Sequence, residues 1–266
     1  MLRDITIGQY YPTPSLIHRL DPRVKIIGTL VYIVSLFLFD SFYGFGITIF
    51  FLACVIILSH VPFRYILRGL KPILFLLFIT MVFNFFLIPG KEIAHFWIFK
   101  ITEEGLYRGL FVGFRLILLI LGSSMMTFTT TPVRLTDGLE QLLKPLSLIK
   151  VPVHDVAMMM SIALRFIPIL LEETDKIMKA QQARGADFES GNVFKRVKAM
   201  VPIFIPLLIS AFRRAFDLAM AMEARCYQGG KGRTKFHPLK YRLADWLAYG
   251  YLAIYLAAII LLRRWI

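Results

Sequence analysis

The sequence predicts an all-α, polytopic membrane protein with about five transmembrane helices and additional long helices in the cytoplasm or at the membrane interface. Hydrophobic residues make up 58% of the 266 residues, and the mean hydropathy is +0.67. Soluble proteins are roughly 45–50% apolar even with glycine counted. Charged residues make up only 18% and are clustered, which leaves apolar stretches long enough to cross a bilayer. This composition excludes a soluble globule and a disordered chain.

Five charge-poor windows are the candidate spans, because a helix needs roughly 20 mostly apolar residues to cross the hydrocarbon layer. The first window is short, and we expect its flanking residues Lys25 and Asp40 at opposite interfaces. Arg115 is the single charge inside the fourth window, where a structural role is favoured over a functional one. Two other apolar stretches, 156–164 and 199–212, are predicted to be too short to cross. The five windows are Ile26–Phe39, Ser41–Ser59, Pro72–Gly90, Gly109–Val133 and Trp246–Leu262.

Loop charges predict the orientation in the membrane. The N-terminal head, residues 1–25, has four Lys or Arg residues, and the segment 132–245 has 18 Lys or Arg against 11 Asp or Glu. The loop at 91–105 has two lysines against three glutamates. The positive-inside rule therefore places the head and the long segment in the cytoplasm. We expect a multi-pass protein of the cell membrane with a cytoplasmic N-terminus, whose net charge of +14 suits contact with the lipid bilayer rather than nucleic acid.

The charge pattern divides the chain into three regions. Residues 1–131 form the head and a four-span membrane region, 132–242 form a cytoplasmic or interfacial helical region, and 243–266 form a C-terminal transmembrane helix. In the middle region we expect two long helices, from about Val153 to Arg184 and from about Phe194 to Tyr227. Prolines lie inside both and are expected to kink or break them.

The ends of these two helices repeat each other at an offset of 41 residues, so that Ala183-Arg184-Gly185 aligns with Ala224-Arg225-Cys226. An arginine in the last turn followed by glycine can simply serve the helix dipole and the C-cap. Cys226 is not expected to be a C-cap residue, so this explanation suits the second helix less well. Residues spaced i, i+3, i+4 and i+7 share a helix face, and each such row ends in the arginine: Ile177, Ala180, Gln181 and Arg184, then Leu218, Ala221, Met222 and Arg225. Two matched copies predict paired docking through the planar guanidinium groups.

A second motif in the head, Leu20-Asp21-Pro22-Arg23-Val24-Lys25, completes a family resemblance. It is similar to the Leu-Asp-Pro-Arg-x-Lys sequence that begins the first span in the transmembrane T subunits (EcfT/CbiQ family) of energy-coupling factor (ECF) transporters. These are ATP-driven importers of vitamins and trace metals. The paired Ala-Arg-Gly-type motifs resemble those of the same family, and Cys226 departs from its consensus glycine.

The resemblance implies that the chain is a coupling subunit of an ECF-type ABC importer. Such a subunit links two cytoplasmic ATP-binding subunits to a small membrane substrate-binding S component. It implies no cofactor on this chain, because ATP is bound by the ATPase partners. The residues implied in ATPase docking are Ala183, Arg184, Gly185, Ala224, Arg225 and Cys226. Those implied in ordering the start of the first span are Leu20, Asp21, Pro22, Arg23 and Lys25.

Three alternatives stay open. A dedicated T subunit for a single substrate, such as cobalt or nickel, would have the same motifs. A stand-alone carrier is less favoured, because it would show internal repeats and polar or broken helices at the midplane. A membrane enzyme would need convergent carboxylates, histidines or cysteines. The five histidines are scattered, Cys54 and Cys226 have no metal-like spacing, and the spans show no convergent polar cluster. We therefore expect no enzymatic activity and no catalytic or metal-binding residue.

Overall fold

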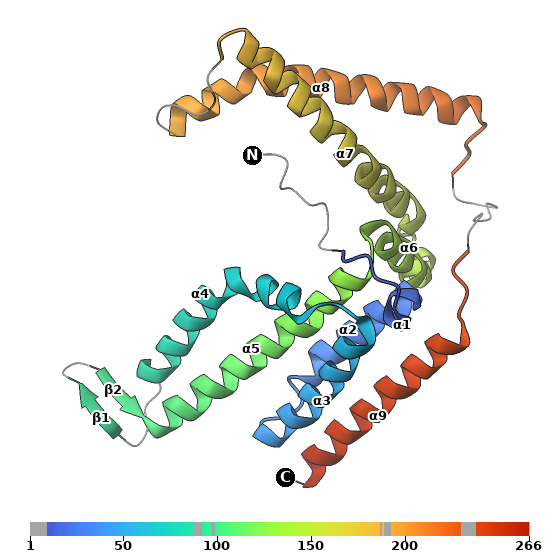
Figure 1. Cartoon of the computed structure of the whole chain (residues 1–266). Coiled ribbons are helices and arrows are strands. Elements are labelled where there is room, and N and C mark those ends of the chain that lie inside the picture. Colours follow the sequence, from blue (N-terminus) through green and yellow to red (C-terminus); the bar gives the residue numbers. More distant parts are fainter. Residues whose placement is uncertain are drawn as a thin grey trace. The chain divides into compact units, whose positions relative to one another are not determined.

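The computed structural model describes residues 10–87, 92–96, 99–186, 188, 193–229 and 238–265, which are mainly helical (Figure 1). They fall into two units. We call Gly8–Leu142 with Leu239–Ile266 the bundle unit, and Leu143–Pro238 the two-helix unit. The all-α membrane class predicted from the sequence is confirmed. One small antiparallel hairpin, β1 (Glu92–Phe96) paired with β2 (Phe99–Thr102), is the exception.

The bundle unit is organised around α5 (Glu103–Thr129), which contacts α2, α3 and α4. The last helix, α9, contacts α2 and α3. The other helices of this unit are α1 (Leu16–Arg19), α2 (Pro22–Ser35), α3 (Phe42–Ser59), α4 (Phe63–Leu87), α6 (Pro132–Leu143) and α9 (Leu243–Trp265). The N-terminal and C-terminal parts of the chain therefore meet in one bundle.

The core of the bundle unit combines apolar packing with internally paired polar groups. Buried side chains from α2, α3, α5 and α9 form one cluster, which includes Tyr32, Phe45, Phe128 and Ile259. The Tyr32 hydroxyl donates a hydrogen bond to the Leu118 carbonyl of α5 at 2.8 Å. Such pairing is required in a membrane, where no water satisfies a buried polar group.

Four helices among the described residues are long and apolar enough to span a membrane: α3, α5, α7 (Val153–Ala183) and α9. Three of them coincide with predicted windows. The fourth, α7, contains the apolar stretch 156–164 and continues through Asp155 and Arg165, the charges that bound this stretch. Its length and composition suit a span, and the expectation that the stretch 156–164 does not cross stays a prediction. Helix α2 has 14 residues, and the window Pro72–Gly90 reaches outside the described residues. The count of five spans therefore stays a prediction.

The two-helix unit contains a 3-10 helix, η2 (Lys144–Ile149), and two long helices, α7 and α8 (Val193–Ala224). Helices α7 and α8 contact each other and cross (Figure 1). Their bounds agree with the predicted helices to within three residues. Pro168, Pro202 and Pro206 lie inside these helices, and both helices continue past them, so the expected breaks are not seen. Helix α6 falls in the bundle unit, and the functional division at residues 132 and 243 stays a prediction.

Candidate functional site

Arg184 is the C-cap residue of α7, with φ −88° and ψ 7°. The N–H of Gly185 donates to the Gln182 carbonyl at 2.9 Å, and the N–H of Ala186 donates to the Gln181 carbonyl at 3.0 Å. Gly185 has φ 89°, in the left-handed region that glycine adopts freely. These two hydrogen bonds and the left-handed residue define a Schellman motif. The predicted triplet at 183–185 is therefore a closed helix end.

The end of α8 has the same backbone geometry. The N–H of Cys226 donates to the Glu223 carbonyl at 2.8 Å, and the N–H of Tyr227 donates to the Met222 carbonyl at 3.0 Å. Cys226 has φ 53° and thus holds the left-handed position. The expectation that Cys226 would not cap the helix is wrong. The two hydrogen bonds require this conformation, although it costs a residue with a Cβ roughly 1–2 kcal/mol.

The two predicted rows of residues, from Ile177 to Arg184 and from Leu218 to Arg225, also match in exposure. On both helices the first and third positions are half-buried, and the second and fourth are exposed. The fourth position is the arginine in each case. Among the described residues, neither Arg184 nor Arg225 has an ion pair or a side-chain hydrogen bond. Both guanidinium groups are therefore available to a partner.

The head motif forms the start of α2. The Asp21 carboxylate accepts the Arg23 N–H at 2.9 Å and both of its oxygens bind the Arg23 guanidinium, at 3.0 and 2.8 Å. Burial alone would raise the pKa of Asp21, but hydrogen bonds from Arg23 and its charge outweigh burial and hold the pKa below its usual value. Pro22 occupies the first turn, where its missing N–H costs nothing. Leu20 is the C-cap residue of α1, and Arg23 lies over the Tyr241 ring at 3.8 Å.

Asp245, which the sequence reasoning missed, joins this motif to α9. Its side chain accepts the Asp21 N–H at 2.8 Å and the Arg242 N–H at 2.7 Å, and the residue is 2% exposed. The second bond runs from the third residue of α9 back to its N-cap position, which is half of a capping box. An acidic residue at that position was the available signal. Lys25 donates to the Thr129 carbonyl at the end of α5 at 2.8 Å. The motif thus fastens the starts of α2 and α9 to the end of α5.

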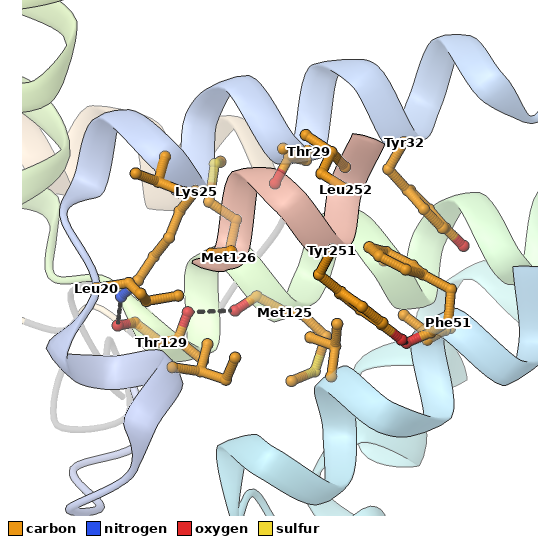
Figure 2. A pocket seen from close by; sticks show the side chains of 17 residues that line it. Leu20, Lys25, Thr29, Tyr32, Phe51, Met125, Met126, Thr129, Tyr251 and Leu252 are labelled. Atoms are coloured by element: carbon orange, nitrogen blue, oxygen red, sulfur yellow. Dashed lines mark hydrogen bonds between the residues drawn. The ribbon is translucent and has the colours of Figure 1, made fainter. Parts of the chain in front are cut away.

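A mostly apolar cavity of about 130 Å³ lies beside Lys25 in the bundle unit. Figure 2 shows Lys25 at one end, turned toward Thr129, and the aromatic rings of Tyr32, Phe51 and Tyr251 at the other. Burial, followed by the charge of Arg134, lowers the pKa of Lys25 to about 8. Lys25 is the one charged side chain among the described residues that line the cavity.

The spans contain a polar cluster that the sequence did not reveal. The Tyr255 hydroxyl of α9 lies 2.7 Å from the Ser35 hydroxyl of α2 and 3.3 Å from the Thr48 hydroxyl of α3. All three residues are buried. The expectation of no convergent polar cluster is therefore wrong for these residues. Because the hydroxyls are uncharged and pair with one another, they join three helices.

Arg115 is held at the end of the first predicted span. Its guanidinium donates to the Phe39 carbonyl at 2.8 Å and to the Asp40 carboxylate at 3.2 Å, and it lies 4.7 Å from the centre of the Phe111 ring. These contacts join α5 to the chain that follows α2. They support the structural interpretation of this intramembrane charge.

Comparisons with known proteins agree with the motifs. A family model described as a cobalt transport protein (CbiQ) matches residues 14–236. The chain is 54% identical over 256 residues to the energy-coupling factor transporter transmembrane protein EcfT of Thermosediminibacter oceani, covering 95% of this chain and 97% of the relative. It is 53% identical over 265 residues to EcfT of Acidaminococcus fermentans (100% and 98% covered) and 49% identical over 240 residues to EcfT of Bacillus subtilis (90% and 91% covered). The match extends over both arginine motifs and the head motif. The chain therefore belongs to the EcfT/CbiQ family, the transmembrane T subunits of energy-coupling factor transporters.

Proposed function

We propose that the chain couples ATP hydrolysis by two cytoplasmic ATP-binding subunits to uptake of a vitamin or another micronutrient through a membrane S component. Arg184 engages one ATPase and Arg225 the other. The observation that carries this proposal is the pair of arginine tips, which share one backbone geometry and are exposed. The printed names of the relatives, which refer to one membrane protein of a transporter, support a multi-component complex.

The structure of the caps favours docking over helix capping as the role of the arginines. Each Schellman motif is built by main-chain N–H groups alone. An alanine in place of Arg184 or Arg225 would leave those hydrogen bonds intact, so the cap does not require an arginine. Within its own helix the guanidinium gains only the dipole interaction, about 0.3–1 kcal/mol. Truncation of one partner of a buried, hydrogen-bonded charge pair in an interface costs more, roughly 2–5 kcal/mol, largely because the other group is left buried and unpaired.

The remaining assignments follow from the same proposal. The head and both arginine tips face the cytoplasm. The bundle unit contacts the S component and the lipid bilayer, and its exposed apolar side chains suit both; Tyr43 is 73% exposed and Ile57 is 71% exposed. ATP is bound by the partner ATPases, and the T subunit itself has no cofactor, no enzymatic activity and no nucleic acid partner.

Alanine substitutions at the two tips test the docking. Arg184→Ala or Arg225→Ala alone should impair uptake and leave much of the complex assembled, because the second contact holds the partners at a high effective concentration. The double variant should release the ATPases in a pull-down while still inserting in the membrane. Lys179→Ala and Arg213→Ala are matched controls, because each removes an exposed cation from the same helix without changing a tip. Full assembly and transport in the double variant would refute the proposal.

A dedicated importer for a single metal is the second candidate, favoured by the description of the matching family model as a cobalt transport protein. The two candidates differ in the number of substrates served. A shared T subunit should support uptake of different vitamins when co-expressed with different S components and the same ATPases. Cobalt uptake with no vitamin uptake under these conditions would favour the dedicated type.

A further inference from the structure

Glu173 of α7 is held by one turn of α8. The Ser210 hydroxyl donates to Oε1 of Glu173, and Arg214 donates to Oε2 from Nε at 3.2 Å and from Nη2 at 2.7 Å. Both carboxylate oxygens are therefore engaged by residues four apart on the partner helix. The Glu173 and Arg214 side chains are 23% and 41% exposed. We call these three residues the crossing clamp.

The clamp residues hold equivalent places in the repeat. Glu173 and Arg214 are 41 residues apart, which is the offset that also separates Arg184 from Arg225. Glu173 and Arg214 thus each precede the tip arginine of their own helix by eleven residues. Eleven residues are close to three helical turns, so the clamp residue and the tip arginine share a helix face, and they lie about 16 Å apart along the axis. The two helices extend equally far from the clamp to their tips.

A cleft beside the clamp shows that packing on this side of the crossing is incomplete. It measures about 350 Å³ and is lined by Arg214 of α8 and by α7 residues that include Lys176, Ile177 and Ala180. These α7 residues lie between Glu173 and the Arg184 tip. Because side chains do not fill this space, close packing cannot by itself fix the angle between the two helices here. The clamp supplies a directional contact at that place.

We propose that the crossing clamp is the pivot that sets the spacing of the two ATPase-docking arginines, with Glu173, Ser210 and Arg214 acting as positioning residues. This inference rests on the proposed function, in which the tips dock the ATPases. The helix segment from the clamp to the tip arginine is about 16 Å long on each helix. A change of 10° in the crossing angle therefore moves one tip by about 3 Å relative to the other. That displacement is the length of a hydrogen bond. A loose crossing would therefore misplace one guanidinium whenever the other is docked.

The pivot is testable by measuring the distance between the tips in the full chain. Spin labels at Lys179 and Met220, each five residues before a tip arginine and both exposed, report this distance by double electron–electron resonance in lipid nanodiscs, in a background without Cys54 and Cys226. Wild-type pairing should give a narrow distribution. Glu173→Arg alone should broaden it, and a change of 10° in the crossing angle should move one label by about 1.6 Å relative to the other, because each label lies about 9 Å along its helix from the clamp.

The reversed pair provides the decisive comparison. Glu173→Arg combined with Arg214→Glu restores opposite charges across the crossing and should recover the narrow distribution, together with the uptake that Glu173→Arg loses. Glu172→Arg is the matched control, because it makes the same charge change one residue away, at an exposed position, and should leave the distribution unchanged. An unchanged distribution in Glu173→Arg, or no recovery in the reversed pair, would overturn the inference.

The two proposals fail separately, because the distance is measured without ATPases. If Glu173→Arg changes the spacing but the Arg184/Arg225 double variant keeps its ATPases, the docking proposal is refuted. The pivot then has no docking role, although the clamp still sets the spacing. If the double variant releases the ATPases but the spacing does not respond to Glu173→Arg, the pivot alone is refuted.

Discussion

Asp245→Ala should destabilise the bundle unit more than alanine substitution of an exposed acidic residue does. The Asp245 side chain is the acceptor for two main-chain N–H groups, one at the start of α2 and one at the start of α9. The bond to the Asp21 N–H is buried, so that N–H would have no other acceptor at hand, whereas the bond to the Arg242 N–H is part-buried; Asp245 itself is 2% exposed. The substitution also removes a negative charge that acts on Lys25. Two helix starts would thus lose their common anchor.

The magnitude follows from the two lost hydrogen bonds. A buried polar group left unpaired costs about 1–3 kcal/mol, so loss of the Asp21 bond costs about 2 kcal/mol at the middle of that range. Loss of the part-buried Arg242 bond adds about 1 kcal/mol, the typical net value of a hydrogen bond. For a chain of this size 1 kcal/mol shifts the melting temperature by roughly 2–4 °C. The expected decrease is therefore about 6–12 °C. Asp245→Asn keeps one acceptor oxygen and should lose about half as much.

The assay is thermal unfolding of the purified protein in lipid nanodiscs, followed by tryptophan fluorescence at a fixed scan rate. Trp246, one of the three tryptophans of the chain, is the residue next to the substitution. Asp40→Ala is the control, because the Asp40 side chain is 93% exposed and has a single 3.2 Å contact with Arg115. If Asp245→Ala melted at the same temperature as Asp40→Ala, the proposed anchoring would be refuted.

Three further predictions concern packing, capping and topology. Gly122→Ala should lower stability by about 1–3 kcal/mol, because the added Cβ would overlap the Tyr32 ring; unchanged thermal unfolding would contradict this. Cys226→Gly should retain transport and slow amide exchange at the end of α8, because it removes a left-handed conformation that costs about 1–2 kcal/mol; faster exchange would count against the assigned cap. A cysteine probe at Lys100 should react with a membrane-impermeant label from outside and one at Arg68 should not, and the reverse pattern would overturn the predicted orientation.

Local sequence signals predicted the helices of the two-helix unit and their ends. The long helices and the arginine tips follow from apolar periodicity, from the repeat and from capping preferences, all of which act over a few turns. These features depend little on the rest of the chain. The family resemblance, rather than a local pattern, implied that Asp21 and Pro22 order the start of the first span, and α2 begins at Pro22 with Asp21 as its N-cap residue.

The contacts that the sequence did not predict join distant residues. The bond between Asp21 and Asp245 spans 224 positions, and no local pattern indicates it. The crossing clamp was missed for another reason. Glu173 and Arg214 hold equivalent positions in the repeat, but one is acidic and the other basic. A search for identical residues in the two copies therefore does not find this complementary pair. The error about Cys226 shows the limit of a statistical preference, because the cap closes wherever its hydrogen bonds outweigh the cost of a Cβ.

The two tips have one geometry but are not energetically equivalent. Gly185 adopts φ 89° freely, whereas Cys226 at φ 53° carries a penalty of roughly 1–2 kcal/mol. A Schellman motif often includes an apolar contact between the second residue beyond the cap and the residue three before it. On α8 these positions are held by Tyr227 and Met222, both half-buried, whereas on α7 they are held by a small and a polar residue. The first tip therefore closes without a backbone penalty, and at the second tip the motif offers apolar residues at the two positions where a contact can offset the penalty. For this reason, a substitution of Gly185 should open the α7 tip more readily than the α8 tip. Truncation of the Tyr227 side chain should instead open the α8 tip.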